Sequence, residues 1–204
     1  MNPFDARARD WDNNPLHWER SEVIASEMLK RIPVSPHFTA LEFGAGTGIL
    51  SFLMAPLFSE ITMLDNSPEM VRVMSEKVQL AKTLHLQPLC CDIEKVDCPG
   101  LHADLLFSQM AMHHVCDVAE ALHKFFGILN KGGYLAITDL YSEDGSFHGA
   151  SFTGHKGFDP KDFEMMLSKA GFSDISIEPC FLQKKPVDGS LKAFPLFLAI
   201  ARKL

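Results

Sequence analysis

The sequence has no apolar run that approaches the ~20 residues of a membrane-spanning helix, so we expect no membrane span. It also lacks excess positive charge: the formal net charge is −7, which argues against electrostatic binding to nucleic acid or anionic lipid. The N-terminal residues MNPFDARARDWD place charges where a signal peptide has its apolar core. We therefore expect a cytoplasmic protein that binds a small molecule, with no nucleic-acid partner; the oligomeric state stays open.

Cysteine is scarce, and its spacing follows no metal or disulfide pattern. The sequence contains no CxxC pair, and the number of cysteines is odd: Cys90, Cys91, Cys98, Cys116 and Cys180. These features favour reduced, buried thiols over a disulfide scaffold or a zinc site. We expect five reduced thiols.

The composition is that of one globular domain. The chain has 204 residues, of which 47% are hydrophobic and 22% charged, and this length suits a single α/β domain with a core of its own. Strand-like and helix-like segments alternate along the chain, which predicts a doubly wound α/β sheet.

The expected elements follow from hydrophobic periodicity and from Gly, Pro and capping residues. Strands are expected at 39–43, 60–65, 84–92, 103–110 and 134–141, and helices at 18–32, 49–55, 67–81, 117–129 and 159–171. A turn is expected at 130–133, and a mobile loop at 142–157. Two final strands, 172–179 and 194–204, are joined by the polar connection 183–190, and they fit an antiparallel hairpin because no crossover helix separates them.

The stretch TALEFGAGTGILSF sets Gly44, Gly46 and Gly48 between a strand and a helix. In open α/β sheets this first strand-to-helix turn is the usual nucleotide site. The spacing is GxGxG rather than the GxGxxG of dinucleotide-binding folds. Glu42 precedes the glycines, and a carboxylate suits an amine-bearing ligand better than a pyrophosphate.

Acidic residues also end the next two expected strands. Asp65 is placed to accept two ribose hydroxyls, and Asp92 to accept from an exocyclic amine such as that of adenine. The alternative for Asp65 is a cap for the helix that starts near Ser67. For Asp92 a structural role and a ligand role remain equally open. Acids at three strand ends fit an adenosine joined to an amino-acid group.

Five segments, FDARARDWD, LEFGAGTG, DNSPEMV, CDIE and FSQMAMHHV, resemble the class I S-adenosylmethionine-dependent methyltransferases, in particular the ubiquinone/menaquinone-biosynthesis-like (type 11) group. The resemblance spans nearly the whole chain and implies a single domain, 1–204, with a Rossmann-like core (37–204) under an N-terminal helical cap (1–36). It implies a seven-stranded sheet, mostly parallel with a C-terminal antiparallel hairpin, and helices on both faces. The implied cofactor is S-adenosylmethionine, with S-adenosylhomocysteine as product.

The resemblance also implies roles for individual residues. The turn Gly44, Ala45, Gly46, Thr47 and Gly48 would lie under the methionine moiety, in an environment held by Glu42, and the ribose would be bound by Asp65. The adenine would be lined by Asn66, Met70, Asp92 and Ile93, the ammonium would face the carbonyl of Ser108, and an aromatic cover would come from Trp11, which replaces the group's usual tyrosine.

Histidines follow the fourth expected strand. Adjacent residues point in different directions, so we expect only one of His113 and His114 to face the site. His113 is the candidate for orienting the acceptor or accepting a proton. We expect no metal site, because adjacent histidines offer poor geometry and no acidic ligand follows at ligand spacing. His148 and His155 lie in the expected loop, where histidines are mostly solvated.

The expected activity is methyl transfer by in-line displacement to a small-molecule acceptor. The chain lacks the (D/N)PP(Y/F) motif of amino-group methylation on adenine or glutamine. Acceptor determinants are expected in the N-terminal helix, around His113 and in the loop at 141–158. The rivals are an NAD-dependent oxidoreductase, against which the GxGxG spacing argues, and a non-catalytic protein that binds S-adenosylmethionine and activates a partner.

We predict that alanine at both Glu42 and Asp65 abolishes cofactor binding, because both carboxylates are expected at the ligand. Calorimetric titration of the double variant measures this, and full retention of affinity contradicts it.

Overall fold

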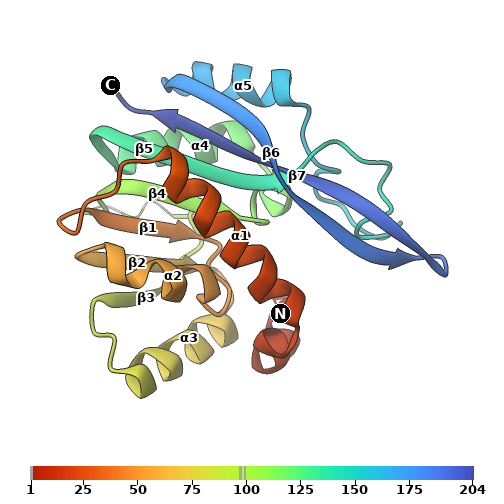
Figure 1. Cartoon of the computed structure of the whole chain (residues 1–204), viewed down its shortest axis with the longest axis horizontal. Helices are drawn as coiled ribbons and strands as arrows, with labels where there is room; N and C mark the ends of the chain where they lie inside the picture. The colour runs from red at the N-terminus through yellow and green to blue at the C-terminus, as the bar shows by residue number, and fades with distance from the viewer. Residues whose placement is uncertain (1, 97, 99) are drawn as a thin grey trace.

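The computed structural model describes residues 2–96, 98 and 100–204. One mixed sheet forms the centre of the molecule (Figure 1). Its strands are β1 (Thr39–Phe43), β2 (Glu60–Asp65), β3 (Leu86–Cys90), β4 (Ala103–Gln109), β5 (Leu129–Leu140), β6 (Ser173–Val187) and β7 (Ser190–Arg202). The α-helices are α1 (Pro15–Arg31), α2 (Ile49–Met54), α3 (Pro68–Ala81), α4 (Val118–Ile128) and α5 (Pro160–Lys169). Short 3-10 helices are η1 (Asp5–Asn13), η2 (Ala55–Leu57) and η3 (Met112–His114).

The strand order is β3-β2-β1-β4-β5-β7-β6. Strands β1 to β5 pair in parallel, whereas β7 is antiparallel to both β5 and β6. The predicted doubly wound, seven-stranded sheet with a C-terminal antiparallel hairpin is confirmed. The chain reverses its direction of winding between β1 and β4, and this is where open α/β sheets bind ligands.

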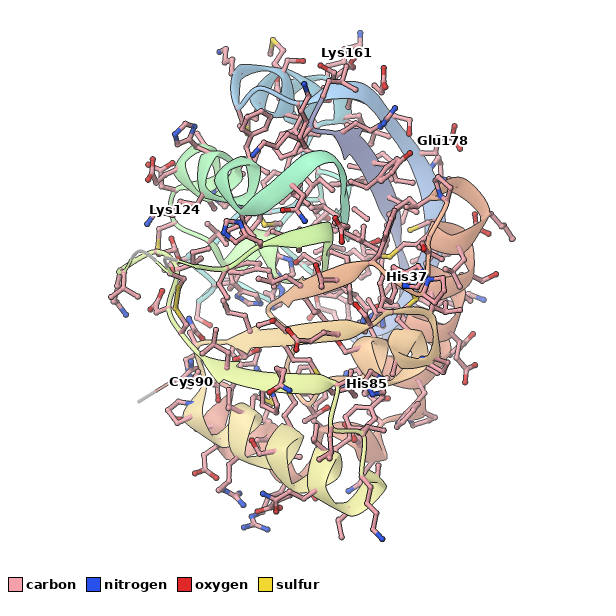
Figure 2. The ribbon with its side chains drawn as sticks, turned by 90° about the vertical axis from the view of Figure 1, so that its left-hand side faces the viewer. His37, His85, Cys90, Lys124, Lys161 and Glu178 are labelled. Carbon is pink, nitrogen blue, oxygen red and sulfur yellow. A yellow bond between two sulfur atoms is a disulfide. The ribbon has the colours of Figure 1, made fainter. Side chains whose placement is uncertain are left out.

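Alternation along the strands sorts side chains onto two helix-covered faces (Figure 2). Leu41 belongs to the apolar cluster with α4 and α5, whereas Ala40 belongs to the cluster with α1, α2 and α3. Glu42 shares the face of Ala40, which directs its carboxylate toward α2.

The helix starts behave as their capping residues predict. The Ser67 hydroxyl accepts from the Met70 N–H at the start of α3, and the Asp117 carboxylate accepts from the Glu120 N–H at the start of α4. The buried face of α3 consists of Met70, Met74 and Val78, and Ala81 at the end of the helix is exposed.

Two predicted connections are wrong in the same way. The turn expected at 130–133 lies inside β5, where four residues bulge out opposite Asp104 between the pairs Ala103–Leu129 and Leu105–Tyr134. The polar connection expected at 183–190 is mostly strand, and the hairpin turns at Asp188 and Gly189, both with positive φ. Polar composition favoured loops, but pairing with a neighbouring strand satisfies the backbone of both segments.

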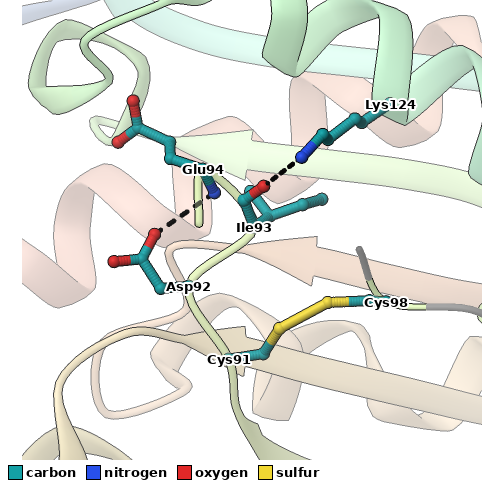
Figure 3. The surroundings of a disulfide bond; sticks show 6 residues. All are labelled: Cys91, Asp92, Ile93, Glu94, Cys98 and Lys124. Carbon is teal, nitrogen blue, oxygen red and sulfur yellow. Dashed lines mark hydrogen bonds between the residues drawn. A yellow bond between two sulfur atoms is a disulfide. The ribbon is translucent and has the colours of Figure 1, made fainter. Parts of the chain in front are cut away.

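The cysteine prediction is wrong in two respects: two of the five cysteines are paired, and none of the five is buried. Cys91 and Cys98 form a disulfide across the segment that follows β3 (Figure 3). Cys90, Cys116 and Cys180 are free thiols. Among the described residues, no helix is long and apolar enough to cross a bilayer.

The N-terminal helix η1 is held to the core mainly by polar contacts. Asp12 accepts from the Thr47 hydroxyl and pairs with Lys77, whose Nζ lies 2.6 Å from Asp12 Oδ2 and 2.9 Å from the Thr47 carbonyl oxygen. At the other end of η1, Asp5 accepts from the Ser67 hydroxyl at 2.7 Å. These contacts tie η1 to the glycine turn and to α3.

We predict that Asp12→Ala loosens η1, because the substitution removes both the Thr47 hydrogen bond and the Lys77 ion pair. Trypsin cleavage after Arg7 and Arg9 should accelerate roughly tenfold, since a hydrogen bond to a charged group contributes about 1.5 kcal/mol or more. Asp10→Ala is the control, because Asp10 bonds only to neighbouring Asn13 among the contacts described. Equal cleavage rates for the two variants would contradict the assignment.

Candidate active site

A cavity of about 460 Å³ opens where β1, β2 and β4 end. Its lining also includes residues of η1, α1, η3, the loop after β5, and β6. The volume lies within the roughly 300–1,000 Å³ range of ligand pockets. The cavity therefore lies at the switch point that the strand order defines.

The glycine turn contacts a different neighbour at each glycine. A Cβ on Gly44 would lie 2.4 Å from the Cβ of Ala111, so Gly44 lets the turn pack against the segment after β4. A Cβ on Gly48 would lie 3.0 Å from Met63 Sδ and 3.1 Å from Met74 Cγ, so Gly48 serves the packing of α2. At Gly46 the nearest such atom is Trp11 Nε1, at 3.8 Å. Gly46 is thus the glycine at which the backbone is open to a ligand under an aromatic side chain.

Asp65 ties two turns together. Its Oδ2 accepts from the Gly46 N–H at 2.7 Å, and its Oδ1 accepts from the Ser67 N–H at 2.8 Å. Burial raises the pKa of Asp65 above its ordinary value, although these backbone donors oppose the shift. The helix cap comes from Ser67 itself, so Asp65 is free to keep lone pairs for a ligand.

Glu42 is buried beneath the same turn. Its Oε2 accepts from both the N–H and the hydroxyl of Ser51 on α2. Burial raises the pKa of Glu42 to about 8, against the lowering effect of the Ser51 hydrogen bonds. A cation placed beside it would favour its ionised form.

The segment after β3 forms the adjoining wall (Figure 3). The Ile93 carbonyl accepts from Lys124 Nζ at 2.8 Å, and Asp92 accepts from the Glu94 N–H at 3.2 Å and pairs with Lys95. The Cys91–Cys98 disulfide closes the loop that contains Asp92 and Ile93.

The structure brings together all the predicted site residues except Gly48 and Ser108. Those that line the cavity are Trp11, Glu42, Gly44, Ala45, Gly46, Thr47, Asp65, Asn66, Met70, Asp92, Ile93 and His113. Gly48 packs under the turn, as described above. Ser108 is fully buried, and its hydroxyl donates to the Phe43 carbonyl, so it joins β4 to β1 rather than lining the cavity.

A buried carboxylate orients His113. Asp139 Oδ1 lies 2.6 Å from His113 Nδ1, and Asp139 Oδ2 accepts from the His113 N–H at 3.1 Å. Asp139 is 0% exposed. Since the carboxylate takes the Nδ1 hydrogen, His113 Nε2 is left as an acceptor, and it lies 2.9 Å from His148 Nε2.

The expectation that only one of His113 and His114 faces the site is wrong. Both line the cavity, because the chain turns tightly through η3. His148 joins them from the loop, where solvation was expected. Burial lowers the pKa of His114 to about 3 and that of His148 to about 4, so both rings are neutral.

A basic and amide-rich wall faces the acids. Arg20 of α1 is buried and donates to Gln183 of β6 at 3.1 Å, and Lys184 and Lys185 of β6 belong to the same lining. Burial lowers the pKa of Arg20 to about 10, while Asp139 opposes the shift, so Arg20 stays cationic. Among the described residues, Arg20 Nε and Gln109 Oε1 are buried without a hydrogen-bond partner.

The sequence reasoning missed Arg20, Asp139, His148 and Gln183. Asp139 carried a usable signal, because it is an acid near the end of an apolar strand, like Asp65. The other three are joined to the site only by tertiary packing of α1, the loop and β6, which no local spacing reveals.

Comparison with known proteins shows a domain match and several similar proteins. Residues 41–137 match the model of the type 11 methyltransferase domain. The chain is 27% identical over 154 residues to an uncharacterised methyltransferase of Schizosaccharomyces pombe, covering 67% of this chain and 54% of that protein. It is 25% identical over 141 residues to malonyl-[acyl-carrier protein] O-methyltransferase of Marinomonas sp., covering 67% and 50% respectively. The chain thus spans about half the length of these two relatives.

Solved structures share the fold. N-methyltransferase NodS of Bradyrhizobium japonicum, solved with S-adenosylhomocysteine, has a TM-score of 0.71 at 19% identity, covering 94% of this chain and 89% of that one. A Haloferax volcanii protein solved with the Trm112 methyltransferase activator has a TM-score of 0.77 at 19% identity, covering 100% and 98%. Residues 41–137, just under half of the chain, thus match the type 11 methyltransferase domain, and the solved structures share the fold. The assignment of the chain to the ubiquinone/menaquinone-like group stays a prediction.

We predict that Glu42 makes stability fall with rising pH. Its pKa is about 8 in the folded chain against an ordinary 4.5, so the folded state holds a proton that the unfolded state releases. Stability should fall from about pH 4.5 to about pH 8 and then level off. Glu42→Gln removes this titration while keeping an acceptor for Ser51. Urea unfolding across this range should show that the free energy of unfolding of the glutamine variant rises relative to that of the natural chain as the pH rises. Parallel pH profiles of the two proteins would overturn the assignment.

Proposed function

We propose that this enzyme transfers a methyl group from S-adenosylmethionine to a small acceptor that bears a carboxylate or phosphate. One observation supports this most: the cavity has an acidic wall around the glycine turn and a cationic wall on α1 and β6. The cofactor bears ammonium and sulfonium charges, which suit the acidic wall. An anionic acceptor suits the cationic wall.

The residues present fit the cofactor. Gly46 leaves backbone accessible beneath Trp11, and the buried carboxylates of Glu42 and Asp65 face a space large enough for a nucleoside. When bound, S-adenosylmethionine supplies an activated methyl group. Asp65 would accept the ribose hydroxyls, and Asp92 with Ile93 would border the adenine.

The N-terminal segment would act as a cap on the core, as the resemblance implies. η1 and α1 together contribute Trp11 and Arg20 to the lining, and the Asp12 contacts hold η1 over the glycine turn. A cap of this kind excludes water from the methyl group and restricts the acceptor to one approach.

Arg20 would bind the acceptor. Its guanidinium is buried, one of its nitrogens has no partner among the described residues, and it lies on the lining beside amide groups of Gln109 and Gln183. An unpaired buried donor is costly unless a ligand satisfies it. Relatives named for malonyl-[acyl-carrier protein] and trans-aconitate act on molecules with carboxylates, which agrees with this chemistry.

His113 would orient the acceptor at the other end. Methyl transfer from a sulfonium is a displacement, so the protein mainly aligns the nucleophile. The Asp139 contact fixes the ring of His113, and the neutral rings of His114 and His148 surround the same space. The acceptor would therefore lie between Arg20 and the three histidines.

The proposal is tested with isotopically labelled methyl donor, a cell extract, and a panel of carboxylic acids and phosphate monoesters paired with their neutral amide or alcohol analogues. We expect the label in an anionic acceptor and not in its neutral analogue. Labelling of neutral acceptors alone would contradict the acceptor class. Donor binding without any labelled product, or tight binding of NADH, would contradict the activity.

The same assay locates the acceptor site. Arg20→Met should raise the acceptor KM roughly 10- to 100-fold, since it removes a charge-assisted hydrogen bond, and should leave S-adenosylhomocysteine affinity unchanged. Arg72→Met is the control, because Arg72 pairs with Glu69 and Glu76 on α3 away from the cavity. An unchanged KM for the Arg20 variant would remove Arg20 from the site.

A further inference from the structure

Three imidazoles from two separate segments meet at one wall of the cavity. His113 and His114 come from η3, and His148 comes from the loop after β5. One ring nitrogen of each lies within 4.8 Å of the other two. The cluster was invisible in the sequence, because His148 follows the pair by more than thirty residues.

The protein fixes the ring that is most deeply buried. Asp139 holds His113 by Nδ1 and by its backbone N–H, and the same carboxylate accepts from the Leu140 N–H. A carboxylate behind a histidine sets the tautomer and raises the basicity of the opposite nitrogen, an arrangement that metal-binding histidines use regularly. The lone pair on His113 Nε2 is consequently aimed at the nitrogen of His148.

The loop is built to keep His148 in place. The His155 N–H donates to the His113 carbonyl at 2.8 Å, and a Cβ on Gly154 would lie 2.3 Å from that same carbonyl oxygen, so only glycine permits this approach. The His148 ring stacks on Phe152 with centroids 4.1 Å apart. Phe147, which directly precedes His148, is anchored to β6 as well, because Lys185 of β6 donates to the Phe147 carbonyl.

We propose that His113, His114 and His148 bind one divalent transition-metal ion, of the kind that imidazole ligands favour, with zinc as the leading candidate. In a tetrahedral site with bonds of 2.0–2.1 Å the ligand nitrogens lie about 3.4 Å apart. The 2.9 Å between the Nε2 atoms of His113 and His148 is shorter than this separation. The upper limit of 4.8 Å on the distances among the three ligand nitrogens is longer. Binding therefore requires the rings of His114 and His148 to shift until these distances match. The fourth position of the ion faces the cavity.

The role of the ion in catalysis rests on the proposed methyl transfer. The acceptor's hydroxyl, acid or thiol binds at the open position and releases its proton to solvent. Its electron pair then forms the bond to the methyl carbon while the carbon–sulfur bond breaks, and the pair from that bond stays on sulfur as S-adenosylhomocysteine forms. The ion lowers the acceptor's pKa and fixes its position, so no single histidine has to act as base.

The test measures metal binding without reference to turnover. Tag-free chain is stripped with a chelator, then titrated with Co²⁺ as the spectroscopic probe and with Zn²⁺ followed by elemental analysis. We expect one ion per chain and visible Co²⁺ absorption typical of low coordination number. His148→Ala and His114→Ala should each weaken binding at least 100-fold. Asp139→Asn should weaken it roughly 10- to 100-fold, as outer carboxylates do elsewhere.

His155→Ala is the matched control. It lies in the same loop, its ring packs on Phe158, and it contributes to the cluster only through its backbone N–H. It should bind metal like the natural chain. Equal metal affinity of the natural chain and the His148 and His114 variants, with circular dichroism showing all of them folded, would overturn the site.

The outcomes separate this proposal from the proposed function. If the variants lose metal binding and no form of the protein transfers a methyl group, the metal site is supported and the proposed methyl transfer is contradicted. Methyl transfer that persists at full rate in metal-free natural chain sinks the catalytic role of the ion. S-adenosylhomocysteine affinity should be the same with and without metal, because the histidines lie on the acceptor side of the cavity.

Discussion

The buried carboxylate of Asp139 is the interaction on which this site depends. A charge with no solvent exposure is tolerable only when hydrogen bonds surround it, and Asp139 obtains them from His113 and Leu140. The nearby cationic Arg20 adds favourable electrostatics, since Asp139 raises its pKa. One side chain on β5 thereby determines the tautomer of a histidine and stabilises a buried guanidinium on a different helix.

The two charged walls follow from the same topology. Acids lie where β1, β2 and β3 end, because parallel strands bring their carboxyl ends to one edge of the sheet. The basic side chains come from α1 and from β6, and β6 lies at the edge of the sheet because β7 inserts antiparallel between β5 and β6. In Figure 1 the β6–β7 hairpin reaches past the end of β5, beside the loop that contains His148. The hairpin extension is thus what carries Gln183 and Lys185 to the cavity.

Sequence alone predicted the fold and most of the residues that line the cavity around the glycine turn. The glycine turn, the strand-end acids Glu42 and Asp65 and the Ser67 cap each stand at the end of a strand or the start of a helix, so residue type and spacing along the chain reveal them. The hydroxyl of Ser108 bonds to the Phe43 carbonyl of β1, a contact that strand pairing decides, and the predicted contact of the Ser108 carbonyl with the ammonium stays a prediction. The histidine cluster and Arg20 were out of reach, since each needs segments brought together by packing. The bulge in β5 shows the same limit, because NKGG is typical of a turn and only pairing with β4 keeps it in the sheet.

The nature of the contacts that hold η1 has a dynamic consequence. Ala8 is the buried residue of that helix, and the side chains of Asp5 and Asp12 attach the helix to the core by polar contacts, while Trp11 attaches it to His17 of α1. Segments with little buried apolar surface open at low free-energy cost, whereas the glycine turn beneath is fixed by the buried Glu42 and Asp65. A ligand as large as a nucleoside needs an opening into the cavity. Displacement of η1 would expose little buried apolar surface, because Ala8 is the buried residue of η1. Opening at η1 would leave the contacts of Arg20 with Gln183, of Asp65 with Gly46 and of Glu42 with Ser51 in place, because none of these contacts involves η1.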